Sequence, residues 1–139
     1  MDESLLDTDI LSEVLKGLDP RVTRKATAYL RAFGHYTTSV LTVMEVVKGL
    51  HKQRHAKKLK QFLAYISAAE VLPFELDSAA VAGRIFADLE QKGQPIGRID
   101  PMIAAIALKK DLTLVTGNLV HYRRIQALGY KLKLENWRS

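Results

Sequence analysis

The chain of 139 residues is 47% hydrophobic and 26% charged, the composition of a soluble globular protein, and we expect a single domain that covers residues 1–139. It contains no cysteine, which excludes disulfides, thiolate catalysis and cysteine-based zinc sites; with no apolar stretch of membrane-spanning length and no signal-like N-terminus, we expect a cytoplasmic protein without a membrane partner. The formal net charge of +6 at pH 7 favours attraction to polyanions, although net charge alone does not identify a partner.

Helical and strand-like patterns alternate along the chain. In chain order, the sequence predicts a strand at 5–7, helices at 9–17 and 19–34, a strand at 35–40, helices at 41–54 and 56–68, a strand at 70–74, helices at 77–93 and 100–111, a strand within 112–118, a helix at 119–128 and a strand at 130–137. Strands separated by helices indicate an α/β domain with a mainly parallel sheet that is covered on both faces.

Several helix boundaries have a candidate capping residue. Asp19 is expected to be an N-cap before Pro20, and Asp77 and Asp100 are expected to cap the helices that they begin. The first helix has two candidate N-caps, Thr8 and Asp9.

The basic residues are unevenly spread. The segment "HKQRHAKKLK" at 51–60 packs five Lys or Arg and two His into ten residues, whereas the N-terminal "MDESLLDTD" is acidic. A solvated helical face is the simpler interpretation of the basic segment, and binding of RNA or of an acidic partner is the functional alternative.

Three polar features lie where predicted strands end or helices begin, the usual place for a site in such a sheet. They are Asp7 after the first strand, Asp100 at a helix start, and Thr116 to Asn118 after "LTLV". Each also has a structural explanation: Asp7 as a turn residue, Asp100 as an N-cap, and Gly117 with Asn118 as residues of positive φ.

Glu45 is harder to explain structurally. It interrupts the apolar sequence "VLTVMEVVKGL", which predicts a largely buried helix, and an ionised carboxylate there needs a partner or a cation. If Asp7, Glu45 and Asp100 converge, their mutual repulsion raises the pKa of at least one of them unless positive charge is supplied. Hard oxygen ligands select Mg²⁺ or Mn²⁺, and an acidic metal pocket in a basic protein suits cleavage of phosphodiesters.

The whole chain resembles a PIN-domain ribonuclease of the VapC toxin type. The resemblance rests on four ordered blocks: "LLDTDILS", "TTSVLTVMEVVKGL", "IGRIDPMIAAIAL" and "LTLVTGNLVHYRRIQALGYKLKLENW". It implies a three-layer α/β/α sandwich with a central, mainly parallel sheet, and Mg²⁺- or Mn²⁺-dependent cleavage of RNA, commonly tRNA or other structured RNA. It also implies a homodimer and a cognate VapB-like antitoxin.

The resemblance assigns roles to individual residues. Asp7 and Asp100 match the two metal-binding aspartates, Glu45 matches the glutamate on the third helix, and Asn118 belongs to the Thr-x-Asn turn beside the metal. These four are the expected catalytic residues, with Glu45 completing the pocket or positioning the attacking water, and hydrolysis is expected to leave a 3′-hydroxyl and a 5′-phosphate. Orienting roles are expected for four further residues: Thr8, Asp9, Thr116 and His121.

His121 departs from the family pattern, in which many relatives carry a fourth acid at that position. Imidazole is a poor ligand for Mg²⁺ but can bind Mn²⁺ or contact phosphate, and a bystander histidine on a surface helix is an equally simple interpretation. The number of metal ions in the mechanism, one or two, therefore stays open.

Two other functions remain open at the level of sequence. The spacing of Asp7 and Asp9 is that of the DxD of haloacid dehalogenase-type phosphotransferases, although Leu11 stands where that pattern has Thr or Val. The other is a non-catalytic basic module that binds RNA or protein and whose acids only cap helices; its RNA binding would fall with salt but ignore EDTA.

Overall fold

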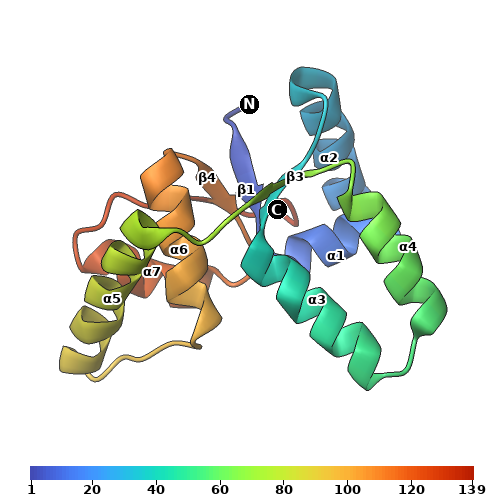
Figure 1. Cartoon of the computed structure of the whole chain (residues 1–139). Coiled ribbons are helices and arrows are strands. Elements are labelled where there is room, and N and C mark those ends of the chain that lie inside the picture. The colour runs from blue at the N-terminus through green and yellow to red at the C-terminus, as the bar shows by residue number, and fades with distance from the viewer.

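Seven helices and five short strands alternate along the chain in the computed structural model, which describes all 139 residues (Figure 1). The strands are β1 (Ser4–Leu6), β2 (Thr37–Ser39), β3 (Glu70–Leu72), β4 (Thr113–Val115) and β5 (Lys133–Glu135). The helices are α1 (Thr8–Lys16), α2 (Pro20–Phe33), α3 (Val40–Lys52), α4 (Ala56–Ile66), α5 (Leu76–Gln91), α6 (Ile99–Lys110) and α7 (Leu119–Ala127). Every predicted element is confirmed; β1 begins one residue earlier than predicted, and the other four strands are shorter than predicted.

All strand pairs are parallel. β1 pairs with β4 and β4 with β5, while β2 pairs with β3. β2 lies beside β1, where the Thr38 hydroxyl donates to the carbonyl of Leu6 at 2.9 Å, so the order across the molecule is β3-β2-β1-β4-β5. The predicted parallel sheet is confirmed, and its strands all end at one edge.

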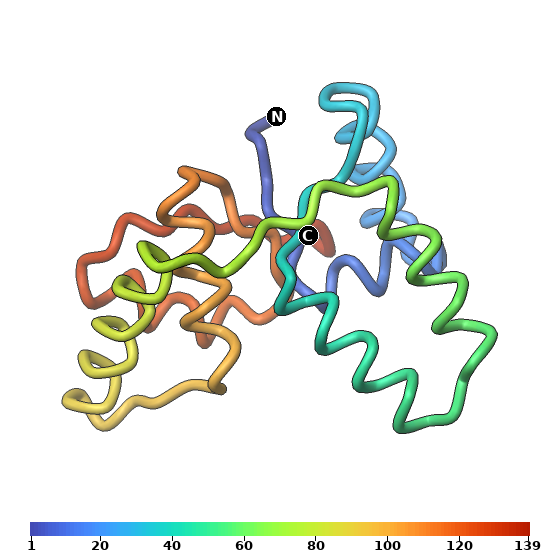
Figure 2. Tube along the Cα trace, in the orientation of Figure 1, coloured from blue at the N-terminus to red at the C-terminus, as the bar shows by residue number.

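Helices cover both faces of the strands, which makes a three-layer α/β/α sandwich. In Figures 1 and 2, α5, α6 and α7 lie on one side of β1 and β4, and α1 to α4 lie on the other. Successive strand residues point to opposite faces: Leu5 and Leu114 belong to the core under α5 and α6, and Leu6 and Val115 belong to the core under α1 and α2. Trp137 is fully buried in the second core.

Capping residues mark where α1 and α2 begin and end. Asp19 accepts from the backbone N–H groups of Arg21 and Val22, and Gly34 ends α2 with φ of 82°, as predicted. The prediction for α1 was wrong by a residue or two, because Asp7, and not Thr8 or Asp9, is the N-cap. The cap of α1 is therefore the first residue after β1.

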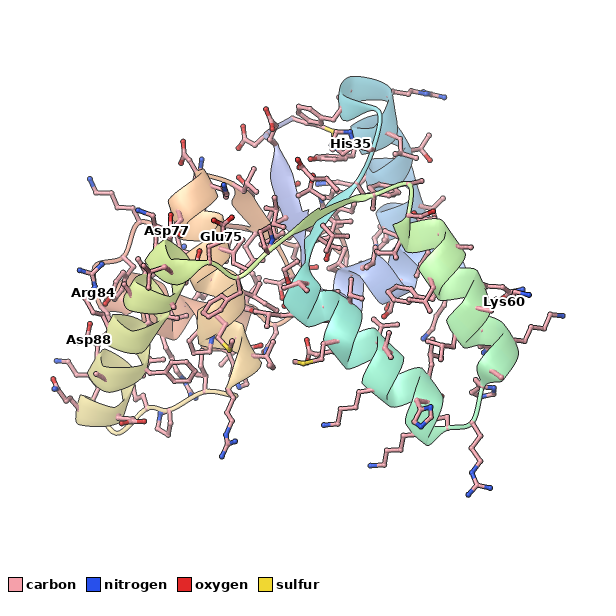
Figure 3. The ribbon with its side chains drawn as sticks, in the orientation of Figure 1. His35, Lys60, Glu75, Asp77, Arg84 and Asp88 are labelled. Carbon is pink, nitrogen blue, oxygen red and sulfur yellow. The ribbon has the colours of Figure 1, made fainter.

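Two further cap predictions are wrong. Asp77 (Figure 3) and Asp100 both lie inside the first turn of their helices, whose N-cap positions are Glu75 and Arg98. Neither of those N-cap residues makes a side-chain capping bond. Asp100 is thus free to point its carboxylate at other groups.

Helices α3 and α4 form a hairpin, residues 40–66, which extends away from the strands at the lower right of Figure 1. The prediction that α3 is largely buried is wrong: only Leu41 and Thr42 are buried, and Val40 and Met44 are exposed. Its other apolar residues are half-buried against the second core, because the hairpin contacts the body along one side only. None of the helices in the chain combines the length and apolar character needed to cross a bilayer.

Candidate active site

Asp7 lies at the end of β1, where the chain turns into α1. Its Oδ1 accepts from the Thr8 backbone N–H at 2.8 Å, and its Oδ2 accepts from the Thr116 hydroxyl at 2.8 Å. The residue is only 6% exposed. The pKa of this carboxyl is raised to about 6: burial is the largest cause, the charges of Asp9 and Asp100 act in the same direction, and the hydrogen bonds from Thr8 and Thr116 act against it.

Tyr122 also donates to Asp7, and sequence reasoning missed it. Its hydroxyl lies 3.1 Å from Asp7 Oδ2, and its ring is fully buried under α7. Burial, together with the charges of Asp7 and Asp100, raises the pKa of the Tyr122 hydroxyl well above its ordinary value, so it remains a hydrogen-bond donor. The one signal in the sequence is a tyrosine next to His121, which is equally typical of a core residue.

A second group gathers around Asp100 in the first turn of α6. Asp100 Oδ2 lies 3.3 Å from the Asn118 amide nitrogen and 3.1 Å from His121 Nδ1, and those two nitrogens are 2.8 Å apart. Asn118 and His121 stand at the start of α7, directly after β4. Asp100, Asn118 and His121 therefore lie within hydrogen-bond distance of one another, and the roles expected for them stay predictions.

The Thr116–Asn118 turn joins the two carboxylates. The Asn118 backbone N–H donates to the Thr116 hydroxyl at 3.0 Å, and that hydroxyl donates in turn to Asp7. The expected positive φ at Gly117 and Asn118 is wrong, because neither residue adopts it. Glycine suits position 117 because there is little room for a side chain: a Cβ there would collide with the side chains of Arg138 and Asp9.

Glu45 is half-buried on α3 and reaches the site through Thr8. The Thr8 hydroxyl lies 2.6 Å from Glu45 Oε1 and 3.2 Å from the hydroxyl of Thr42. Within the protein, the partner of Glu45 is therefore the Thr8 hydroxyl, and the Thr8 backbone N–H links it to Asp7. Thr42, which sequence reasoning also missed, fixes Thr8 from the buried side of α3.

Asp9 is bound to the loop after β4 and to the C-terminal Arg138. Its Oδ2 accepts from the backbone N–H of Gly117 at 2.9 Å and lies 3.7 Å from Arg138 Nη1. Arg138 also pairs with Glu13 at 3.1 Å. Asp9 thus anchors the loop after β4, and its geometry fits the orienting role predicted for it. No feature of the sequence near Asp9 predicts its contact with Arg138, which lies 129 residues later in the chain.

The donor chemistry of these acids fits a hard divalent cation. Asp7 accepts three hydrogen bonds of about four that a carboxylate can accept, while Asp100 Oδ1 and Glu45 Oε2 accept none. No three Asp, Glu or His side chains stand close enough together to hold an ion by themselves. This arrangement suits Mg²⁺, which is usually held by one or two carboxylates and completes its shell with water and phosphate oxygens.

Comparison with known proteins agrees with this geometry. The family model of the PIN domain matches residues 4–126. The chain is 35% identical over 100 residues to the tRNA(fMet)-specific endonuclease VapC of Salmonella typhimurium, covering 71% of this chain and 73% of that protein. It is 31% identical over 138 residues to ribonuclease VapC2 of Haemophilus influenzae, covering 96% of each.

The fold of this chain is also similar to that of one chain in a solved VapBC complex. A chain in the crystal structure of DNA-bound VapBC from Salmonella typhimurium superposes with a TM-score of 0.83 at 28% identity, over 99% of each chain. The superposition spans nearly the whole chain, including both helical layers and the α3–α4 hairpin. The chain therefore belongs to the PIN-domain family and, within it, to the VapC type.

Proposed function

We propose that this chain is an endoribonuclease that uses a divalent cation, and that it is the toxin of a toxin–antitoxin pair. The observation that carries the proposal is the buried hydrogen-bonded network that brings Asp7 and Asp100 together at the carboxyl edge of a parallel sheet. The names of the relatives, a tRNA(fMet)-specific endonuclease and a ribonuclease, support RNA, and tRNA in particular, as the substrate. The VapBC complexes among the structural neighbours support a VapB-like antitoxin as partner, and the homodimer stays an expectation from the resemblance to VapC proteins.

PIN-domain ribonucleases generally depend on divalent metal ions, and we assign the metal-holding role here to Asp7 and Asp100 with Mg²⁺ or Mn²⁺. A bound divalent cation supplies positive charge to the scissile phosphate and makes a neighbouring water more acidic. The raised pKa of Asp7 supports this assignment, because a buried carboxyl held among other acids is stabilised in its charged form by a cation.

The remaining residues have orienting roles in this proposal. Thr116 and Tyr122 fix Asp7, and Asn118 and His121 fix Asp100. Thr8 binds Oε1 of Glu45, which leaves Oε2 to position the attacking water and accept its proton. His121, with a side chain 38% exposed, is also able to donate to a phosphate oxygen. The attacking oxygen comes from water and the bond from phosphorus to the ribose 3′-oxygen breaks, with a proton taken up by that oxygen, so the products carry a 5′-phosphate and a 3′-hydroxyl.

The test is cleavage of purified bulk tRNA by antitoxin-free protein with Mg²⁺ or Mn²⁺, resolved on a denaturing gel. Wild type should give discrete fragments that disappear with EDTA, and Asp7→Asn and Asp100→Asn should each reduce the rate by at least about 100-fold. The matched control is Asp111→Asn, since Asp111 is an exposed aspartate at the far end of α6 with φ of 53°, a conformation that asparagine also accepts.

Asp111→Asn should cleave like wild type. Full activity of a folded Asp7→Asn variant would contradict the assignment of the metal ligands. Salt-sensitive tRNA binding without cleavage, unaffected by EDTA, would instead support a binding module.

A further inference from the structure

Most of the net positive charge of the molecule lies on one structural unit, the α3–α4 hairpin. Between Glu45 and Glu70 the chain has no acidic residue, and this stretch contains six of the 21 Lys and Arg residues. The other 15 Lys and Arg residues are equalled in number by the 15 Asp and Glu residues of the chain, so residues 46–69 alone account for the formal charge of +6; the hairpin, which also contains Glu45, carries a formal charge of +5.

These cations are exposed and unpaired. The six side chains, all on the surface, are Lys48, Lys52, Arg54, Lys57, Lys58 and Lys60. None of them takes part in any of the ion pairs of the molecule, which all lie elsewhere. Figure 3 shows Lys60 extending outward from α4, away from the body. An unpaired positive surface of this kind favours a polyanion over a neutral partner.

The basic surface is connected to the active site along one face of α3. Glu45, Lys48 and Lys52 are spaced i, i+3 and i+7, which places them on the same side of the helix. Glu45 contacts the site through Thr8, and Lys52 lies about 10 Å further along the helix axis. An RNA backbone that leaves the site along α3 would therefore pass from the acidic groups of the site to the lysines of the hairpin within a few nucleotides.

The turn of the hairpin contains a hollow of about 330 Å³ lined by His51, Arg54 and His55 together with apolar side chains. Arg54 adopts φ of 59°, a conformation that favours glycine, yet the position holds a long cationic side chain. The rim of the hollow thus gathers nitrogen donors at the end of the basic face.

We propose that the α3–α4 hairpin is an arm that binds the sugar–phosphate backbone of the RNA outside the cleaved bond. This inference rests on the proposed ribonuclease function and deepens it. Because the cations recognise phosphates and not bases, the arm contributes affinity for structured RNA without choosing a sequence. Its geometry favours a substrate long enough to reach from Glu45 to the turn of the hairpin.

The test measures binding of fluorophore-labelled bulk tRNA in EDTA, where cleavage plays no part, over a series of salt concentrations. Lys48→Gln/Lys52→Gln/Lys57→Gln should bind about tenfold or more weakly and lower the slope of log K against log salt by about 2 to 3. Replacement of the same three lysines by Arg should retain wild-type binding, which separates loss of charge from loss of fold.

The matched control is Lys109→Gln/Lys110→Gln/Lys131→Gln, three exposed lysines at the opposite edge of the sheet. An equal loss of slope in this control, or an unchanged slope in the hairpin variant, would overturn the proposal. A hairpin variant that binds tRNA like wild type but loses affinity for a poly-glutamate peptide would also overturn it, and would assign the surface to an acidic protein. Absence of cleavage by wild type in Mg²⁺ would count against the nuclease function alone.

Discussion

The ionised carboxylate of Asp7 should destabilise the metal-free fold at neutral pH, and Asp7→Asn tests this. The folded-state pKa of about 6, against the ordinary value of 3.8, corresponds to a penalty of at most about 3 kcal/mol. Below pH 3.8 the carboxyl is protonated in both states and no penalty exists. Between 3.8 and 6 the folded state holds more protons than the unfolded chain, so the free energy of unfolding falls as the pH rises, and above 6 the penalty is complete.

Asparagine removes this charge but loses hydrogen bonds. One carboxylate oxygen becomes a donor, so bonds such as those from Thr116 and Tyr122 to Oδ2 are lost, at about 1 kcal/mol each. The net result at pH 7.5 is a variant more stable than wild type by about 1 kcal/mol, or about 3 to 4 °C in Tm for a chain of this length. At pH 4 the penalty has largely gone, and Asp7→Asn should be less stable by about the same amount.

The assay is urea unfolding in EDTA at both pH values, followed by the fluorescence of the single tryptophan, Trp137, which is fully buried. Asp111→Asn serves as the control, because its carboxyl is exposed and its substitution should shift stability little at either pH. A difference between Asp7→Asn and wild type that keeps the same sign and size from pH 4 to 7.5 would refute the reasoning.

Three further predictions concern the same site. Added Mg²⁺ at 100 times its Kd should increase the free energy of unfolding of wild type by about 2.7 kcal/mol and so raise its Tm, but should leave the Tm of Asp7→Asn and Asp100→Asn almost unchanged. A thermal shift of equal size in all three proteins would disprove the ligand assignment. Tyr122→Phe should cost about 1 to 2 kcal/mol at pH 7.5, measured by urea unfolding, because a buried acceptor on Asp7 loses its donor; no loss would mean that water replaces the hydroxyl. His121→Asp should tighten Mn²⁺ binding in calorimetry by adding a carboxylate beside Asp100, and weaker binding would show that imidazole is the better neighbour.

Much of the fold could be predicted because its signals are local. Asp19, Pro20 and Gly34 mark both ends of α2, and apolar or β-branched runs mark each strand. The parallel pairing of the strands follows from the alternation of strands and helices, whereas the order of the strands was not predicted. The same reasoning predicted that residues after β1 and β4 meet at one edge, which brought Asp7 and Asn118 to the correct place.

The failures have a common cause in long-range packing. Nothing local distinguishes an apolar helix in the core from the half-exposed α3, so its burial was predicted wrongly. The hydroxyl of Tyr122 reaches Asp7 across 115 positions, and Gly117 is constrained by Arg138 from the C-terminus. Contacts of this kind depend on where elements meet, which no spacing in the sequence encodes.

Comparison of two N-caps separates the structural role of Asp7 from its function. Asp19 and Asp7 both accept backbone N–H groups at the start of a helix. At Asp19 slight desolvation is outweighed by the bonds from Val22 and Arg21, and its pKa is lowered, as expected for an acid that only caps. At Asp7 the effect of burial is larger than that of the hydrogen bonds, and the pKa is raised to about 6. The ionised carboxylate of Asp7 therefore destabilises the fold, which a capping role does not require. The nearby Arg138 is paired with Asp9 and Glu13, which leaves Asp7 without a cation of its own and its charge available to a bound metal ion.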